Sequence, residues 1–213
     1  MTSGRKGYKE EVLMKGKFIL IEGGDGSGKS TIVRYVANEF RKRKIKVVTT
    51  REPGGSRVAE GIRKAFINTQ LSDTTLLFCY VAARSAWVEQ VLKPKLQQGN
   101  IVLCDRSYPS TYAYQGIAGG LGLKRVAELC QIAMQKIKPD IVIVLDVDHR
   151  EGLKRSHATG DVNALEKKGM IFHKKVNNAY RQLAKKYRWK LIDANRPLEN
   201  VKKEVWAIVK KLV

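Results

Sequence analysis

The stretch GGDGSGKS, residues 23–30, constrains this chain more than any other. It follows the apolar run FILI, precedes IVRYVANEF with its helical spacing, and fits the pattern G-x-x-x-x-G-K-[ST]. Glycines let backbone N–H groups curve around phosphate oxygens at the start of a helix. In this pattern Lys29 reaches the β- and γ-phosphates, and the hydroxyl of Ser30 ligates Mg²⁺. We therefore expect a nucleoside triphosphate, ATP, to contact these residues: Gly23, Gly24, Asp25, Gly26, Ser27, Gly28, Lys29, Ser30 and Thr31.

Apolar runs of strand length alternate with amphipathic stretches along the whole chain. The pattern predicts strands at residues 18–22, 45–50, 101–105, 141–147 and 190–193. It predicts helices at residues 29–43, 74–98, 124–136, 167–186 and 198–212. Strands that alternate with helices of this length favour an α/β fold, here a five-stranded parallel sheet flanked by helices.

The composition excludes several classes of protein. The chain has 213 residues, 43% of them hydrophobic, and no apolar run near 18 residues, so we expect one full core and no membrane partner. The N-terminal segment lacks the apolar centre of a signal peptide, and the three cysteines are too far apart for a metal site or disulfide framework. A cytoplasmic protein is the simplest expectation. The net charge of +21 is spread over several segments without a nucleic-acid motif, so solvated helix faces explain it better than a nucleic-acid partner.

The chain contains no internal repeat, low-complexity linker or domain boundary. We expect residues 1–15 to be an N-terminal extension and residues 16–213 to be a single domain. The segment RSHATGDVNALEKKG is polar and lies between a predicted strand and a predicted helix, as a closing lid would. We therefore predict a mobile lid at about residues 150–168.

Three motifs accompany the phosphate loop: TREPGG after the second strand, LLFCYVAARSAWVEQVLKP in the next helix, and CDRSYPSTYAYQG after the third strand. Together with KPDIVIVLDV and IDANRPLENV they resemble the thymidylate kinases, which phosphorylate dTMP to dTDP, from residue 18 to about residue 205. The resemblance implies the P-loop kinase fold with a mobile lid, that is, a P-loop nucleoside monophosphate kinase domain. It implies ATP and Mg²⁺ as cofactors, dTMP as the acceptor for dTTP synthesis, and a homodimer.

The resemblance also assigns the residues that receive dTMP. Asp25 corresponds to the carboxylate that holds the sugar 3′-hydroxyl and the acceptor phosphate region, while Arg51 lines the acceptor pocket and Pro53 shapes the base site. Three residues match positions around the sugar and base: Ser110, Tyr114 and Gln115. Tyr114 would pack where a ribose carries its 2′-hydroxyl and so favour deoxynucleotides.

In the resemblance, two residues of one predicted helix recognise the base. Tyr80, where family members more often have Phe, would stack on thymine, and Arg84 four residues later would hydrogen-bond the base edge. A tyrosine in the helix core is the structural alternative for Tyr80. Phe78, two residues earlier, is expected in the core.

The charges for phosphoryl transfer come from several predicted loops. Two anionic phosphates approach only if cations neutralise them, and Arg106 resembles the family arginine that clamps the acceptor phosphate. Asp105 ends a strand where it can join Ser30 in holding Mg²⁺, directly or through water. The predicted catalytic residues are Lys29, Arg106, Arg155 and Asp25.

The chain departs from the family pattern in its transition-state arginines. The P-loop position that carries an arginine in some members is Gly26, and the lid has His157, Thr159, Asn163 and Ala164 where arginines or an Asp-Arg pair are expected. Only Arg155 and Glu166 fit the lid pattern. An arginine finger contributes about 10³–10⁵ in rate, so its source matters. Arg155 is the preferred source, and its position also suits stacking on adenine; the alternatives are Lys167, Lys168 or Arg150, or a slower enzyme with a related acceptor.

Near the C-terminus, DANRPLENV resembles the loop over adenine, with Asn195 and Arg196 as candidate contacts, although a helix N-terminus capped before Pro197 explains it nearly as well. Three other functions stay open. The chain could phosphorylate another or broader set of pyrimidine nucleoside monophosphates (dUMP, UMP, CMP), hydrolyse ATP on nucleic acid, or bind nucleotides without catalysis. The acceptor motifs favour dTMP.

Overall fold

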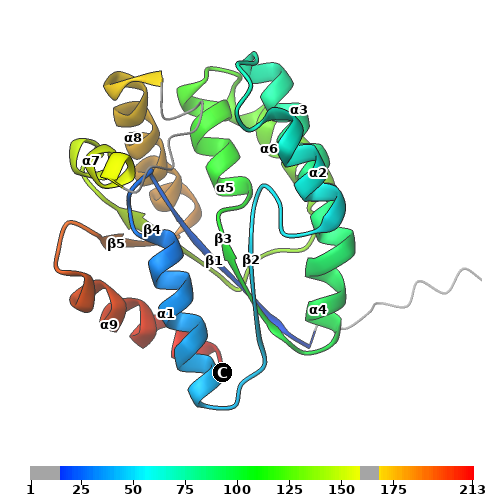
Figure 1. Cartoon of the computed structure of the whole chain (residues 1–213), viewed down its shortest axis with the longest axis vertical. Helices are drawn as coiled ribbons and strands as arrows, with labels where there is room; N and C mark the ends of the chain where they lie inside the picture. Colours follow the sequence, from blue (N-terminus) through cyan, green and yellow to red (C-terminus); the bar gives the residue numbers. More distant parts are fainter. Residues whose placement is uncertain (1–14, 159–167) are drawn as a thin grey trace, which may run out of the picture.

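The computed structural model describes residues 15–158 and 168–213, and a five-stranded parallel sheet forms its centre (Figure 1). The strands are β1 (Lys17–Gly23), β2 (Val47–Arg51), β3 (Ile101–Asp105), β4 (Ile141–Asp146) and β5 (Lys190–Asp193). They lie in the order β2-β3-β1-β4-β5, and every neighbouring pair is parallel. The predicted α/β architecture is confirmed, and each strand boundary lies within two residues of the expected one.

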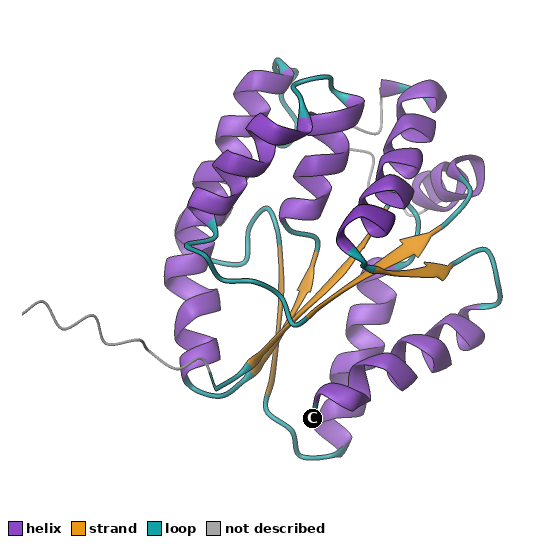
Figure 2. Cartoon of the chain, turned by 180° about the vertical axis from the view of Figure 1, so that it is seen from behind, coloured by secondary structure: helices purple, strands orange, loops and turns teal. Residues whose placement is uncertain are grey.

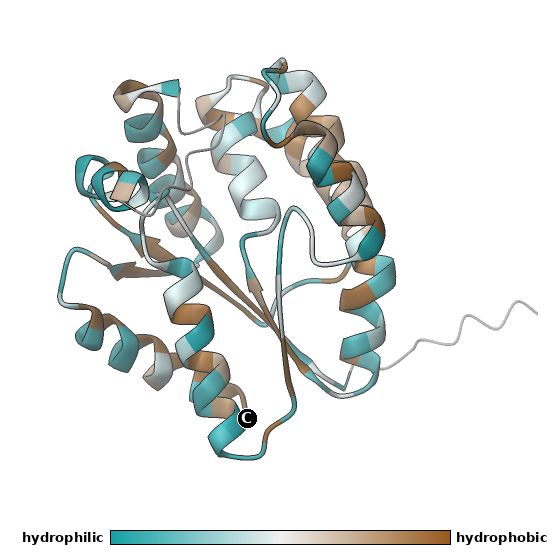
Figure 3. Cartoon of the chain, in the orientation of Figure 1, coloured by the Kyte–Doolittle hydropathy of each residue, from teal (hydrophilic) through white to brown (hydrophobic). Residues whose placement is uncertain are grey.

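Different helices bury the two faces of the sheet. In β1, Ile19 and Ile21 point to the face covered by α1 (Lys29–Lys42) and α9 (Leu198–Val209), whereas Phe18 and Leu20 point to the opposite face. This alternation is the period of two that a strand imposes on its side chains. Figures 1 and 2 show the sheet between the two helical layers, and Figure 3 shows that the strands are mostly apolar while the helices carry both polar and apolar residues.

The remaining helices complete the layers and the site. They are α2 (Arg57–Phe66), α3 (Asp73–Trp87), α4 (Lys93–Gln97), α5 (Tyr108–Thr111), α6 (Leu123–Ala133), α7 (His149–Ala158) and α8 (Met170–Tyr187). Two π-helical segments, η1 (Val88–Leu92) and η2 (Tyr112–Ala118), continue α3 and α5, and a 3₁₀ turn, η4 (Lys210–Leu212), ends the chain. The single helix predicted at residues 74–98 is therefore α3, η1 and α4 in succession.

Three helical stretches differ from the sequence expectation. The first is α2, which the sequence analysis did not assign; it begins after Ser56, whose side chain accepts a hydrogen bond from the N–H of Ala59. The second is the hydroxyl-rich stretch α5–η2, where Pro109 occupies the first turn. The third is α7, which makes the first part of the predicted lid helical; residues 159–167 lie outside the described residues.

The core position predicted for Phe78 is wrong. Its side chain is 58% exposed, whereas Leu77 and Tyr80 on the same helix are buried. Apolar residues are frequent on all sides of α3, so spacing alone does not identify the buried face.

The parallel sheet brings its functional loops to one edge. β1, β2, β3 and β4 end together, and the loops that follow them carry the phosphate loop, TREPGG, the motif at Arg106 and the start of α7. Ligands in open α/β sheets bind at this carboxyl edge. Within residues 15–158 and 168–213, no helix is long and apolar enough to cross a bilayer.

Candidate active site

The phosphate loop connects β1 to α1. Gly28 has φ 89°, a left-handed conformation that glycine adopts without a steric penalty, and α1 begins at the next residue. The ammonium of Lys29 donates to the carbonyl of Gly24 (2.7 Å) and to the hydroxyl of Ser27 (3.3 Å). Burial, with a further contribution from the charge of Arg106, lowers the pKa of Lys29 to about 8. A bound triphosphate would add negative charge beside this buried ammonium and favour its protonated form.

The two predicted metal ligands lie in contact. The hydroxyl of Ser30, in the first turn of α1, donates to Oδ2 of Asp105 at the end of β3 (2.5 Å). A hydroxyl and one carboxylate are oxygen donors of the kind that Mg²⁺ accepts, because this ion usually takes one or two protein ligands and completes its shell with water and phosphate. The described residues contain no cluster of three or more His, Cys, Asp or Glu side chains that could hold a metal alone. The donor set therefore fits Mg²⁺ bound together with a nucleotide.

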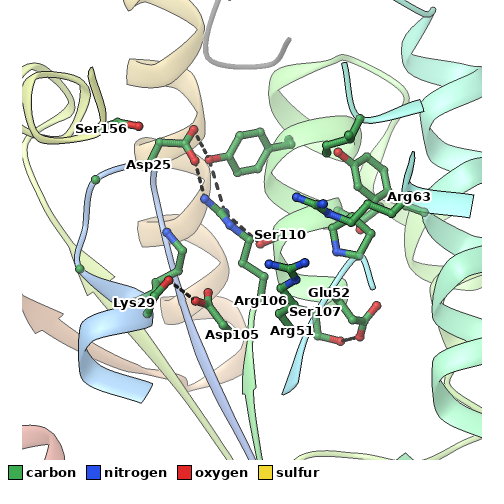
Figure 4. Close-up of a pocket in the computed structure, with 18 of the residues that line it drawn as sticks. Asp25, Lys29, Arg51, Glu52, Arg63, Asp105, Arg106, Ser107, Ser110 and Ser156 are labelled. Carbon is green, nitrogen blue, oxygen red and sulfur yellow. Dashed lines mark hydrogen bonds and ion pairs between the residues drawn. The ribbon is translucent and has the colours of Figure 1, made fainter. Parts of the chain in front are cut away.

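Arg106 occupies an uncommon backbone conformation directly after β3. Its φ is 66°, in the left-handed region, and its N–H donates to the carbonyl of Ile21 (3.0 Å). Backbone strain of this kind concentrates at functional sites, where the surrounding structure enforces it. The resulting position directs the guanidinium toward the phosphate loop, where it donates to the carbonyl of Gly23 (3.2 Å) and pairs with Asp25 (Figure 4).

Asp25 is the centre of a charged network. It accepts from the hydroxyl of Tyr114 (2.8 Å) in addition to pairing with Arg106, and Nδ1 of His173 lies 3.5 Å from its Oδ2. Burial alone would raise the pKa of Asp25, but the charges of Arg106 and Lys29 and the hydroxyl of Tyr114 hold it below its usual value. Asp25 is thus an anion positioned beside cations that can bind phosphate.

One cavity of about 1070 Å³ joins the phosphate loop to the acceptor motifs (Figure 4). Most of the residues predicted to bind ligands line it: Asp25, Gly26, Gly28, Lys29, Ser30, Thr31, Arg51, Pro53, Tyr80, Arg84, Asp105, Arg106, Ser110, Tyr114, Gln115 and Arg155. Five predicted residues are not among its lining residues: Gly23, Gly24, Ser27, Asn195 and Arg196. The cavity is lined both by the phosphate loop and by the acceptor motifs, as a transfer between two bound nucleotides requires.

The predicted base site combines a ring, a buried ion pair and an unsatisfied donor. Tyr80 is buried and meets Phe66 edge to face at 5.0 Å, so one part of its ring contacts the core while the residue also lines the cavity. Nε of Arg84 pairs with Glu52 (2.7 Å), and its guanidinium also donates to Thr111 (3.0 Å). Nε2 of Gln115 is buried and has no acceptor among the described residues. A buried donor without a partner on a cavity wall is suited to a ligand oxygen.

Two further arginines that line the cavity, Arg51 and Arg155, differ in their contacts. Arg51, at the end of β2, pairs with Glu60 at 3.3 Å and is more than half exposed. Arg155, on α7, pairs with Glu151 (2.9 Å) and donates to the carbonyl of Ala194 (3.2 Å), next to the loop predicted to cover adenine. In that loop, the side chain of Asn195 accepts from the N–H of Asp148 (2.8 Å).

Other predicted lid and loop cations do not line the cavity. Arg196 pairs with Glu204, and Lys168 pairs with Asp73 of α3 (2.6 Å). The backbone N–H of Arg150 donates to the carboxylate of Asp148 (2.9 Å). The candidates Thr159, Asn163, Ala164, Glu166 and Lys167 lie outside the described residues. Among the described alternatives, Arg155 alone lines the cavity.

The structure explains why the phosphate loop has glycine where some family members have arginine. A Cβ on Gly26 would lie 1.8 Å from the carbonyl oxygen of Gly152, and a Cβ on Gly152 would lie 2.4 Å from that of Asp25. The backbones of the loop and α7 therefore touch, with no space for a side chain. Arg155 lies one helical turn after Gly152, so the same contact brings it to the cavity.

We expect Gly26→Ala to lower the stability of the protein by about 2 kcal/mol, because the new methyl group must displace backbone atoms and strain a residue at φ 66°. For a chain of this length, thermal unfolding should shift down by roughly 4–8 °C. Gly61→Ala is the matched control, since nothing lies within 4 Å of its Cβ and alanine is favoured in the middle of α2. An unchanged melting temperature for Gly26→Ala would contradict the close approach.

Several residues of the site were not found from the sequence. Glu22 and Glu52 are buried beside Ser107, while Arg34 and Arg63 line the cavity. Arg63 lies on α2. The spacing of Ala59, Ile62 and Phe66 is typical of a helix, and this signal could have predicted the helix that carries Arg63. The only sequence signal for Glu22 is a carboxylate at the end of an apolar strand, directly before the phosphate loop.

The comparisons with known proteins agree with this geometry. The family model for thymidylate kinase matches residues 21–205. A thymidylate kinase of Pseudomonas putida (strain GB-1) is 39% identical over 94% of this chain and 98% of its own length; one of Geobacillus thermodenitrificans is 38% identical over 92% and 90%. The crystal structure of thymidylate kinase from Ehrlichia chaffeensis covers 91% of this chain and 98% of its own, with a TM-score of 0.74 and 29% identity. The P-loop kinase fold is thereby confirmed, and the chain belongs to the thymidylate kinase family.

Proposed function

We propose that this enzyme transfers the γ-phosphoryl group of ATP to the 5′-phosphate of dTMP, forming dTDP for dTTP synthesis. The observation that carries the proposal is one cavity lined both by Lys29 and Ser30 of the phosphate loop and by three residues of the predicted base site, Tyr80, Arg84 and Gln115. Arg106 and Asp25 pair with each other and line the same cavity, and the two phosphates would meet beside them.

The proposed transfer relies on positioning and charge. The acceptor phosphate is already anionic and needs no strong general base, so the main obstacle is repulsion between the two phosphates. Lys29 would bind the β- and γ-phosphates, and Arg106 would clamp the acceptor phosphate. Mg²⁺, when held by Ser30 and Asp105 with the nucleotide, would neutralise charge on the phosphate oxygens.

The acceptor nucleoside would be recognised by groups that the fold holds rigidly. The ring of Tyr80 offers a stacking surface, while Arg84 and Gln115 offer donors to the base edge. Glu52 and Thr111 hold Arg84 in one orientation, which supports recognition of one base edge rather than nonspecific attraction. Tyr114 would pack on the deoxyribose, with Asp25 near the 3′-hydroxyl, and Arg51 and Pro53 would complete the pocket.

The adenine of ATP is proposed to lie near the end of α7. Arg155 lines the cavity there, and its hydrogen bond to Ala194 places it against the loop that carries Asn195 and Arg196. Of these three predicted contacts, Arg155 is the best supported. Residues 16–213 would act as one domain, with the lid at about residues 150–168 closing over ATP to exclude water.

We also propose that the enzyme works as a homodimer in the cytoplasm. Phe78 on α3 is 58% exposed and Ile132 on α6 is 73% exposed, and these two helices pack together. Two large apolar side chains on neighbouring helices suit an interface between copies. Sedimentation velocity distinguishes one chain from two, and a monomer at micromolar concentration would contradict the dimer.

The acceptor is tested by ADP release from Mg·ATP with dTMP, dUMP, UMP, CMP, AMP and GMP supplied singly. We expect kcat/KM to be highest for dTMP and lowest for the ribonucleotides, because the base edge and the sugar edge are both read by buried groups. Similar activity with several pyrimidines would favour the broader kinase, and ATP binding without turnover would favour a non-catalytic protein.

A further inference from the structure

Glu22 is a carboxylate buried in the central strand of the sheet. Its side chain is fully buried on the face of β1 that also carries Phe18 and Leu20, and it does not line the cavity. A carboxylate in such a place is costly unless hydrogen bonds and charges compensate it. Here they do: Oε1 accepts from the N–H of Ser107 (2.6 Å), and Oε2 accepts from the hydroxyls of Ser110 (2.7 Å) and Tyr180 (3.0 Å).

These donors connect Glu22 to the guanidinium that faces the acceptor phosphate. A serine hydroxyl has one proton and two lone pairs. When Ser110 donates its proton to Glu22, a lone pair remains for Nη1 of Arg106, which lies 3.3 Å from Ser110 Oγ. The bond from Ser107 N–H holds the backbone one residue after Arg106 as well. Glu22 thus acts on Arg106 from two sides without touching the cavity.

We propose that Glu22 is a positioning residue for phosphoryl transfer: its carboxylate orients Ser110 and the Arg106 backbone so that the guanidinium faces the acceptor phosphate. This inference rests on the proposed acceptor roles of Arg106 and Ser110. It deepens them, because it accounts for the left-handed backbone of Arg106 and for a buried charge that the fold alone does not require.

The charged groups around Glu22 are consistent with this role. Burial raises its pKa to about 7, against the lowering effects of Ser110, Arg106, Ser107 and Tyr180. Arg84 on α3 and Lys29 on α1 also interact electrostatically with it. The negative charge of Glu22 disfavours ionisation of three neighbouring groups, Cys104, Tyr108 and Tyr180. Cations on two helices and on the loop after β3 therefore offset part of the effect of burial, which disfavours the anion that the proposed hydrogen bonds require.

The test is Glu22→Gln, which keeps the shape of the side chain and removes its charge. We expect kcat/KM for dTMP to fall by about 10- to 100-fold, because a charged acceptor is lost, while KM for ATP stays within about twofold. Asp140→Asn is the control: it removes the same charge near the opposite edge of the sheet, where Asp140 pairs with Lys17, and should leave both constants unchanged. Equal losses toward dTMP and ATP, together with a lower melting temperature, would overturn the proposal in favour of a structural role.

A double-mutant cycle with Ser110→Ala tests the route. If Glu22 acts largely through Ser110, the double variant should lose far less kcat/KM for dTMP than the product of the two single losses. Full additivity would overturn the proposed path. If Ser110→Ala leaves kcat/KM for dTMP unchanged, the proposed role of Ser110 in the acceptor site is wrong. If Ser110→Ala lowers kcat/KM but Glu22→Gln does not, the positioning role of Glu22 is wrong and the proposed function still stands.

Discussion

Arg106→Ala is expected to lower kcat by about 10³-fold, with little change in the affinity for ATP. The left-handed backbone and the pair with Asp25 direct the guanidinium toward the phosphate loop, where the two phosphates are proposed to meet. Removing a group that stabilises transferring charge typically costs two to three powers of ten or more. Lys29, which is proposed to bind the β- and γ-phosphates of ATP, is held separately by the carbonyl of Gly24 (2.7 Å). Steady-state kinetics with dTMP and calorimetry with a non-hydrolysable ATP analogue measure the two quantities.

Arg106→Lys is the matched variant for this prediction. Lysine keeps the charge but lacks the planar fork that reaches Gly23, Asp25 and a phosphate together, so an intermediate loss is expected. Thermal unfolding must accompany the kinetics, because the alanine variant leaves Asp25 without its cation. Activity equal to that of the unchanged enzyme would remove Arg106 from the proposed mechanism.

The sheet was predictable because its signal is local. Each strand is a short apolar run, so all five strands were predicted close to their observed bounds. Their alternation with helices indicated a parallel sheet. Phe78 shows the limit of the same reasoning. Its helix is apolar on several sides, and only the three-dimensional packing identifies which side faces solvent.

The site was predictable where a motif carries it, and not where packing does. Asp25, Lys29, Arg84 and Arg106 were named from motifs, and they line one cavity. Glu22 belongs to no such motif; its importance comes from three donors that follow it in the chain by 85 to 158 residues. Contacts over such distances are visible only once the chain is folded.

The contact between Gly26 and Gly152 also depends on the fold, and it bears on the second cation of the reaction. Because the phosphate loop has no room for a side chain at Gly26, a cation for the ATP side must come from elsewhere. Arg155 is the described lid residue that lines the cavity. Its pair with Glu151 is part-exposed and costs little to break, so a turn of Arg155 toward bound phosphates would mainly give up the hydrogen bond to the carbonyl of Ala194.

Arg155→Ala is therefore expected to lower kcat by at least about 100-fold at saturating ATP and dTMP. Stacking of the same residue on adenine would appear separately, as a higher KM for ATP, so both constants should be determined. Arg150→Ala and Lys168→Ala are the controls on either side of residues 159–167. Neither side chain lines the cavity, and both variants should keep kcat within about threefold if Arg155 supplies the charge. A neutral Arg155→Ala with a large loss in either control would transfer the role to that residue; neutrality in all three would direct the search to Lys167.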